Sequence, residues 1–209
     1  MTLHGRRNPF VAQEGLPFLL LLLVLIAAIL RFGNPLWVLA PGLLFALLVL
    51  IFRDPPRPVP SSPLGVVSPV DGKIVSVERT SEDVLHDDAW RLVIAIDSWG
   101  TYTARCPVEG KIMNLRAEAR ERHIDYRTNA LWVQTDEGVD VVLQFHGYRF
   151  GLAPRSFMGY GERLGQGQRC AYLRLARFAE VHLPADSQIL VEPGATVTGG
   201  SDMLAKVTH

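Results

Sequence analysis

The residues of this chain that are best suited to proton transfer or metal binding are few and widely spaced. Asp71 lies in a Pro-Val-Asp-Gly turn, where a carboxylate can act as a general acid or base or can cap the backbone of its own turn. His146 and His182 suggest a metal pair, but no carboxylate or third histidine is spaced to complete it, so we expect no metal. Cys106 and Cys170 are far apart and neither belongs to a CxxC motif, which indicates two ordinary thiols in a reducing compartment.

The charges of the chain are balanced, with 21 basic and 21 acidic residues among 209. A chain without net charge has no general attraction to polyanions, so we expect no nucleic-acid partner. The part that follows residue 52 is long enough for one ordinary domain, whose core needs neither disulfide bonds nor metals.

Two long apolar segments near the N-terminus, without a charge at 16–30 and at 35–52, predict a pair of transmembrane helices at about 16–32 and 35–52. Each is near the lower limit of length for crossing about 30 Å of hydrocarbon. Asn34 and Pro35 are suited to the N-cap and first turn of the second helix. A signal peptide is the alternative, but no A-x-A-like cleavage site followed by polar sequence is present. We therefore predict that residues 1–52 are a membrane anchor.

Basic residues near these segments predict their orientation. Arg6 and Arg7 precede the first segment and Arg53 and Arg57 follow the second, whereas the connection between them contains only Arg31. The excess of positive charge at the outer ends places both termini in the cytoplasm.

Residues 53–64 predict a stiff, extended, proline-rich linker, and residues 65–209 predict a β-rich domain. The domain contains short runs of β-branched and apolar residues separated by Gly, Pro and Asp. The one candidate helix, 114–122, is short and charged. The predicted strands are 65–67, 73–77, 91–96, 131–134, 139–145, 171–175, 179–183 and 188–191.

A six-residue phrase occurs twice, as Pro-Val-Asp-Gly-Lys-Ile at 69–74 and Pro-Val-Glu-Gly-Lys-Ile at 107–112. A third strand-turn-strand element begins at Val191 and leads to 203–207. Such units favour a mainly β, barrel-sandwich-like fold. The alternative is that the phrase is a common hairpin sequence that arose twice.

Six segments follow one another from Phe52 toward the end of the chain. They are FRDPPR at 52–57, VSPVDGKI at 67–74, RCPVEGKI at 105–112, GERLG at 161–165, VHLP at 181–184 and the closing stretch 191–205. Taken together and in this order, they resemble the small phosphatidylserine decarboxylases.

The resemblance implies a proenzyme that cuts its own backbone before a serine and converts that serine into a pyruvoyl group. The pyruvoyl group then serves as the electron sink for decarboxylation, and an aspartate and a histidine assist the cut. In this chain Asp71 matches the aspartate, but Arg177 stands at the serine position, Ala176 at the preceding glycine and Tyr102 at the histidine. Arginine cannot yield a pyruvoyl group, and an unperturbed tyrosine is a poor base at neutral pH.

The resemblance therefore predicts a protein of bacterial phospholipid metabolism, at the inner membrane, that does not process itself. We expect it to bind a phospholipid headgroup through Tyr102 and Arg105, or to bind another protein of lipid metabolism, without a cofactor. One alternative is an active carboxy-lyase that makes phosphatidylethanolamine, with a pyruvoyl group formed from Ser156, Ser187 or Ser201. A second alternative is a barrel-sandwich adaptor of a membrane assembly.

Overall fold

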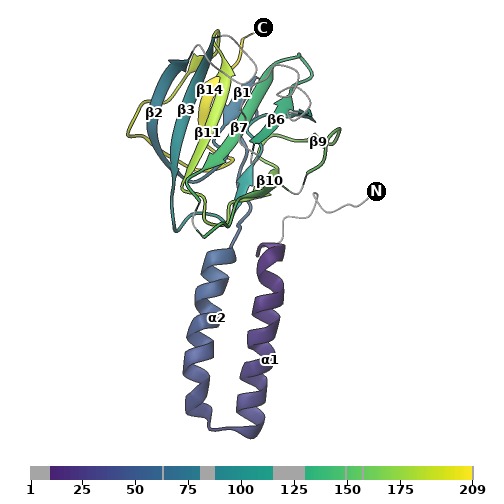
Figure 1. Ribbon diagram of the computed structural model, residues 1–209, viewed down its shortest axis with the longest axis vertical. Helices are drawn as coiled ribbons and strands as arrows, with labels where there is room; N and C mark the ends of the chain where they lie inside the picture. The colour runs from purple at the N-terminus through teal and green to yellow at the C-terminus, as the bar shows by residue number, and fades with distance from the viewer. Residues whose placement is uncertain are drawn as a thin grey trace. The chain divides into compact units, whose positions relative to one another are not determined.

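The computed structural model describes residues 10–62, 64–80, 88–114, 130–148, 150–156 and 158–208 (Figure 1). The predicted helix at 114–122 lies almost entirely outside these residues. The chain divides into two units, Met1–Pro56 and Arg57–His209.

The first unit is a helical hairpin. Helix α1 spans Leu16–Phe32 and helix α2 spans Leu39–Phe52, each preceded by a 3₁₀ turn, η1 at Gln13–Gly15 and η2 at Pro35–Val38. With these turns, both segments are long and apolar enough to cross a membrane. Asn34 caps η2 as predicted, because its side-chain oxygen accepts a hydrogen bond of 3.0 Å from the backbone N–H of Leu36.

Backbone hydrogen bonds tie the two ends of the hairpin together. The N–H of Ala12 donates to the carbonyl of Phe52 at 2.8 Å, and the N–H of Asp54 donates to the carbonyl of Phe10 at 2.7 Å. The ring of Phe52 stacks on Phe18 with 6.4 Å between centroids. A Cβ at Gly15 would lie 2.4 Å from the Phe52 ring, so the close approach at this position requires glycine.

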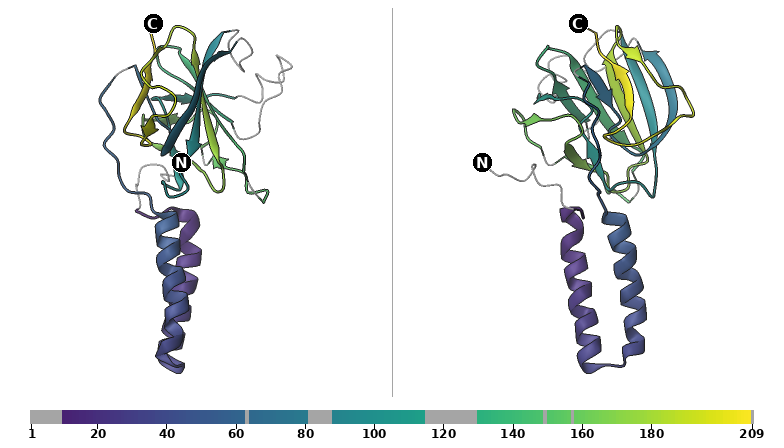
Figure 2. Two further views of the ribbon diagram at one scale, coloured as in Figure 1. Left: turned by 90° about the vertical axis from the view of Figure 1, so that its left-hand side faces the viewer. Right: turned by 180° about the vertical axis from the view of Figure 1, so that it is seen from behind.

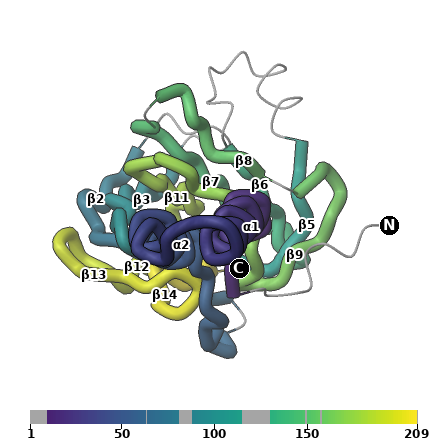
Figure 3. The backbone as a smooth tube through the Cα atoms, turned by 90° about the horizontal axis from the view of Figure 1, so that it is seen from below, coloured from purple at the N-terminus to yellow at the C-terminus, as the bar shows by residue number. Residues whose placement is uncertain are grey.

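The second unit is built from antiparallel strands (Figures 1 and 2). The described strands form a large sheet in the order β13-β2-β3-β11-β7-β6-β5-β9 and two small sheets, β1-β14-β12 and β4-β10-β8. Figure 3 shows the strand ends of the large sheet from β2 to β9. The strands are β1 Gly65–Val67, β2 Gly72–Thr80, β3 Ala89–Ile96, β4 Thr103–Arg105, β5 Gly110–Ile112, β6 Ala130–Gln134, β7 Asp140–His146, β8 Arg155–Ser156, β9 Arg163–Leu164, β10 Arg169–Tyr172, β11 Phe178–Pro184, β12 Gln188–Ile189, β13 Thr196–Val197 and β14 Met203–Lys206.

One apolar core joins the three sheets. Alternate side chains of the central strands point into it, as in β11, where Ala179, Val181 and Leu183 are fully buried. Val66 of β1 and Leu204 of β14 belong to the same cluster. The prediction of a mainly β fold with two apolar N-terminal helices is confirmed. The barrel-sandwich prediction is not, because the large sheet stays open, with β13 and β9 at its ends among the described strands.

The predicted strands at 171–175 and 188–191 both extend too far, and the second ends at Ile189. The segment predicted as a strand at 171–175 leaves the sheet after Tyr172 and turns, because Arg174 adopts a positive φ of 52° and Ala176 donates back to the carbonyl of Leu173. This turn positions Arg177 directly before β11. The described linker residues 54–62 form neither helix nor strand.

The repeated phrase has the same structure in both copies. In each copy the glycine begins a strand, and a Cβ there would lie within 2.1 Å (Gly72) or 2.2 Å (Gly110) of a carbonyl oxygen on the neighbouring strand. The residue two positions before each copy also donates a backbone hydrogen bond to the proline of the other copy. The N–H of Arg105 donates to the carbonyl of Pro69, and the N–H of Val67 donates to the carbonyl of Pro107. The glycines are therefore required because the strands approach closely.

Candidate functional site

The fold brings three positions marked by the sequence resemblance to one edge of the large sheet. Asp71 precedes β2, Arg177 precedes β11, and Tyr102 follows the turn after β3. The N–H of Ile96 donates to the carbonyl of Arg177 at 2.8 Å, and the N–H of Asp97 donates to the carbonyl of Asp71 at 2.9 Å. Consecutive residues at the end of β3 therefore bridge the two positions. We call this region the Asp71 edge.

The Asp71 carboxylate accepts three hydrogen bonds from distant parts of the chain. The guanidinium of Arg57 donates at 2.7 Å, the N–H of Thr101 at 2.9 Å and the N–H of Gly199 at 2.8 Å. Only 14% of the Asp71 side chain is exposed. A carboxylate has about four acceptor positions, so most of its capacity is used here. Asp71 thus holds the linker, the 97–102 turn and the 198–202 turn together.

Tyr102 and Arg177 lie at the same edge in different environments. Tyr102 is half-buried, and its ring lies 5.9 Å from the ring of Tyr172. Its neighbour Thr101 is the residue that donates to Asp71. The Arg177 side chain is exposed, while its backbone is paired on both sides, with its N–H donating to the carbonyl of His146 at 3.2 Å. The edge therefore combines a fixed carboxylate, an aromatic ring and an accessible guanidinium.

The residues at the Asp71 edge do not fit a pyruvoyl group. Such a group replaces a residue that carries a side-chain hydroxyl, and Arg177 has none. The peptide at Arg177 is also held by backbone bonds to His146 and Ile96.

Arg105, predicted to contact a substrate, is buried in β4 with 2% of its surface exposed. Its Nη1 donates to the carbonyl of Gly167 at 3.2 Å. A Cβ at Gly200 would lie 2.6 Å from Arg105 Cδ, so the aliphatic part of the side chain packs directly against the 198–202 turn. This position suits an internal support of that turn, and contact with a substrate stays a prediction.

The three serines considered as alternative nucleophiles occupy separate places. Ser201 lies in the 198–202 turn beside the Asp71 edge, and its hydroxyl donates to the carbonyl of Pro58 at 2.9 Å. Ser156 in β8 donates to the carbonyl of Cys170 at 3.3 Å. Ser187 is buried and follows β11 at its far end from Arg177. Of the three, Ser201 is the one whose turn bonds directly to Asp71.

His146 and His182 both lie near the carboxylate of Glu180, a contact that was not predicted from the sequence. Glu180 Oε1 lies 2.6 Å from His146 Nε2, and Glu180 Oε2 lies 3.6 Å from His182 Nε2. A hydrogen bond from His182 lowers the pKa of Glu180 to about 2, and the electrostatic effect of His146 acts in the same direction. The signal was present in the sequence, because residues two apart on a strand share a face. Within the described ranges, no group of three such side chains has metal-binding geometry.

The two cysteines are free and fully buried. Burial raises the pKa of Cys106 to about 12 and raises the pKa of Cys170 well above its usual value. Both thiols therefore stay protonated and unreactive at neutral pH.

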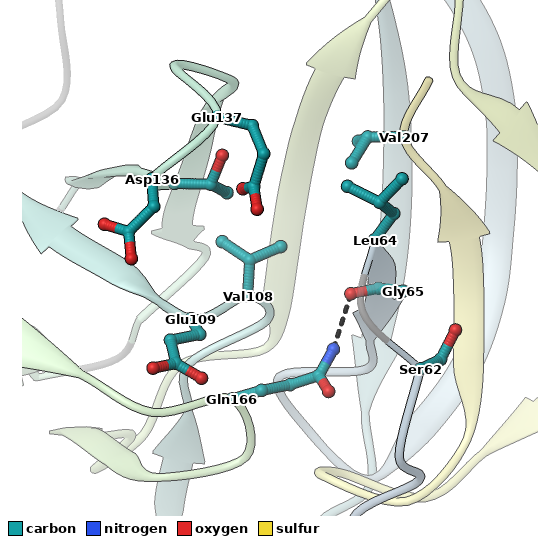
Figure 4. Close-up of a pocket in the computed structure, with 10 residues that line it drawn as sticks. Ser62, Leu64, Gly65, Val108, Glu109, Asp136, Glu137, Gln166 and Val207 are labelled. Carbon is teal, nitrogen blue, oxygen red and sulfur yellow. Dashed lines mark hydrogen bonds between the residues drawn. The ribbon is translucent and has the colours of Figure 1, made fainter. Parts of the chain in front are cut away.

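A separate pocket with a cavity of about 290 Å³ lies away from the Asp71 edge (Figure 4). The carboxylates of Glu109, Asp136 and Glu137 line one side, and the apolar residues Leu64 and Val207 line the other. Three carboxylates repel an anion, so the pocket is unsuited to a phosphate group. An anion is better accommodated at the Asp71 edge, where Arg177 is exposed.

Comparisons with known proteins agree with the sequence resemblance. Residues 44–93 match the family described as phosphatidylserine decarboxylase. The chain is 31% identical to the phosphatidylserine decarboxylase proenzyme of Aromatoleum aromaticum over 96% of this chain and 97% of that protein. It is 32% identical to the proenzymes of Nitrosomonas eutropha (95% and 96% covered) and Burkholderia ambifaria (96% and 97% covered).

Among solved structures, glucose permease IIA from Mycoplasma capricolum is 20% identical with a TM-score of 0.46. The match covers 68% of this chain and 94% of that one. This likeness is too low to support an argument.

Proposed function

The chain belongs to the phosphatidylserine decarboxylase family, and from this premise we propose that it is a member that does not cleave itself and instead binds a phospholipid headgroup at the Asp71 edge. The family acts in phospholipid metabolism on a membrane phospholipid. The observation that carries the proposal is Arg177, which stands where the resemblance expects a serine and lies beside Asp71 at the same sheet edge. No pyruvoyl group would then form.

The chemistry of Arg177 supports an anionic ligand. A guanidinium presents several N–H donors in one plane, which match the oxygens of a phosphate or carboxylate. A serine phospholipid headgroup contains both anions and one ammonium group. We propose that Arg177 binds an anion of the headgroup and that the ring of Tyr102 lies beside it. Asp71 would position the turn that carries Tyr102, because its carboxylate accepts a hydrogen bond from the N–H of Thr101.

The intact mass of the purified full chain in detergent tests the absence of self-cleavage. We expect one species near 23.2 kDa. Two fragments, the smaller blocked at its N-terminus by a pyruvoyl group, would overturn the proposal. In that case Ser201→Ala, Ser156→Ala and Ser187→Ala would identify the nucleophile, and Ser201 would be examined first because its turn bonds to Asp71.

A gain-of-function variant provides the complementary test. The triple substitution Ala176→Gly, Arg177→Ser and Tyr102→His restores the residues that the resemblance expects. We expect this variant to cleave itself to a measurable extent, since Asp71 is already in place. A matched variant without Arg177→Ser should stay intact. Cleavage in that control would show that residue 177 is not the decisive position.

Headgroup binding is tested with glycerophosphoserine, which is soluble in water. We expect Arg177→Ala to weaken binding about tenfold, the effect of losing one charge-assisted hydrogen bond. Arg79→Ala is the matched control, because Arg79 is an exposed arginine near the opposite end of β2, where it lies over the Trp90 ring. Equal binding by both variants would refute the role of Arg177.

We further propose that α1 and α2 cross the bacterial inner membrane with both termini in the cytoplasm, as the arginine distribution predicts. Cysteines introduced at the exposed positions Phe32 and Asp186 test this orientation. We expect a membrane-impermeant thiol reagent added to intact cells to label position 32 and not position 186. The reverse pattern would invert the orientation.

A further inference from the structure

We propose that three loops at the Asp71 edge insert their exposed apolar side chains into the surface of an anionic phospholipid bilayer. The loops are 97–102, 147–154 and 173–177, and we call their described residues the loop rim. Trp99 is 67% exposed and Phe150 is 90% exposed. Tyr148, Leu152 and Leu175 are each more than two-fifths exposed. The same rim therefore exposes two large aromatic side chains and several smaller apolar ones.

The three loops are neighbours in space because their strands are neighbours in the large sheet. Strands β3, β11 and β7 lie side by side, and Phe178 is opposite both Ala95 and His146 (Figures 1 and 2). Two hydrogen bonds join the loops further. The N–H of Leu173 donates to the carbonyl of Tyr102 at 2.9 Å, and Arg174 Nη1 contacts the carbonyl of Ala153 at 3.4 Å. The exposed side chains thus belong to one surface.

The composition of the rim suits the interface between water and lipid. Tryptophan and tyrosine are enriched at that depth, because their rings are apolar while their N–H or O–H group can stay hydrated. Phe150 and Leu152 are purely apolar side chains that gain by leaving water. A contiguous exposed apolar surface on a folded domain commonly marks a contact with a partner or a membrane.

The charges of the rim are complementary to phosphate. Arg174 and Arg177 belong to the 173–177 loop, and exposed Arg155 lies on β8, next to the 147–154 loop. Asp97 is the one acidic residue among the described residues of the three loops. By contrast, the turn at Thr135–Glu137, at the other end of β7, contributes two carboxylates to the acidic pocket. An anionic membrane surface attracts arginines and repels carboxylates, so it favours the loop rim over the opposite end.

The linker connects the Asp71 edge to α2 through a short stretch of chain. Arg57 bonds to Asp71 at this edge and follows Phe52, the last residue of α2, by a short stretch of chain. Five residues extend no further than about 18 Å. The short length of this stretch limits how far the Asp71 edge can move from the last residue of α2.

The proposal goes beyond headgroup binding at Arg177, because insertion of the rim does not depend on whether the chain cleaves itself. Site-specific labelling of the full chain in lipid nanodiscs tests it. The native thiols of Cys106 and Cys170 are buried, so a cysteine introduced by Phe150→Cys is the one that reacts. Glu137→Cys is the matched control, because Glu137 is exposed in the turn before β7. Each variant carries an environment-sensitive fluorophore.

The nanodiscs contain equal parts of phosphatidylcholine and phosphatidylglycerol, with spin-labelled lipids as quenchers. We expect about twofold or stronger quenching at position 150 relative to position 137, because interfacial segments lie about 5–10 Å within the headgroup region. Replacing phosphatidylglycerol with phosphatidylcholine should reduce that difference. Equal quenching at both positions would overturn insertion and would indicate that the loop rim binds a protein partner instead. An unchanged difference without phosphatidylglycerol would overturn the anionic preference.

The two proposals fail separately in these experiments. Glycerophosphoserine binding needs no bilayer, so it reports on Arg177 alone. Phe150→Ser leaves Arg177 in place and should retain glycerophosphoserine binding. In the Phe150→Cys background, Trp99→Ser should reduce quenching at position 150. Quenching that is unaffected by Trp99→Ser would show that the aromatic rim does not drive insertion.

Discussion

The phrase Pro-Val-acid-Gly-Lys-Ile occurs at 69–74 and at 107–112. The two copies have a similar backbone arrangement, but the acidic side chains Asp71 and Glu109 have different surroundings. Both glycines approach a neighbouring carbonyl closely, and the residue two positions before each copy donates a backbone hydrogen bond to the proline of the other copy. Val70 and Val108 are both buried in the common core. The phrase therefore encodes a strand start that does not by itself specify a functional site.

The acidic side chains of the two copies have different environments. Asp71 is covered by the linker and by the 198–202 turn, and it accepts hydrogen bonds from Arg57 and Gly199. Glu109 is exposed on the side of the acidic pocket. The difference shows that segments distant in sequence, rather than the phrase itself, make Asp71 a structural centre.

The largest effect should come from removing each acid. We expect Asp71→Ala to lower the free energy of unfolding by about 3–5 kcal/mol, because it leaves a partly buried guanidinium and two backbone N–H groups without their acceptor. Glu109→Ala should change it by about 0.5 kcal/mol or less, as for most exposed positions. Urea unfolding in detergent, followed by the fluorescence of Trp90 and Trp132, measures both. Similar losses of unfolding free energy from the two substitutions would show that Asp71 and Glu109 do not differ in their structural role.

The shared backbone predicts equal effects from the two glycines. A Cβ at either Gly72 or Gly110 would collide with a carbonyl oxygen of the adjacent strand. We expect Gly72→Ala and Gly110→Ala each to cost about 2–3 kcal/mol, since a backbone neighbour cannot move aside as a side chain can. The same unfolding experiment measures the two variants. A loss of stability in only one of the two variants would show that the two copies are not structurally equivalent.

Local sequence patterns predicted the elements better than the site. The segments 16–32 and 35–52, Asn34 as a cap and most strands follow from hydrophobic pattern and turn chemistry, which act over a few residues. The partners of Asp71 could not be predicted in this way, because Arg57 and Gly199 approach it only when the sheets are assembled. The open large sheet depends on the same long-range pairing.

The contribution of the linker can be separated from that of the 198–202 turn. Arg57→Ala removes one of the three donors to Asp71 but leaves the N–H groups of Thr101 and Gly199 in place. We expect a loss of about 1.5 kcal/mol, the usual contribution of a hydrogen bond to a charged group. In the double variant Arg57→Ala and Asp71→Ala, the losses should not add, because both substitutions break the same pair. Additive losses would place the main partner of Arg57 elsewhere.

Glu180 provides a third carboxylate, held by histidines rather than by backbone and arginine. Its pKa is lowered to about 2, so it contributes stability above the ordinary carboxyl range, and that contribution is lost as the pH falls toward 2. We expect Glu180→Gln to destabilise the neutral protein by only about 1 kcal/mol, because water screens part of the interaction. The difference from the unmodified chain should shrink between about pH 5 and pH 2 and vanish below it. Unfolding measured across this range checks the slope. A difference that is independent of pH would mean that the shape of the Glu180 side chain, and not its charge, explains its contribution to stability. Glu180 would then differ from Asp71, whose expected contribution depends on its hydrogen-bonded charge.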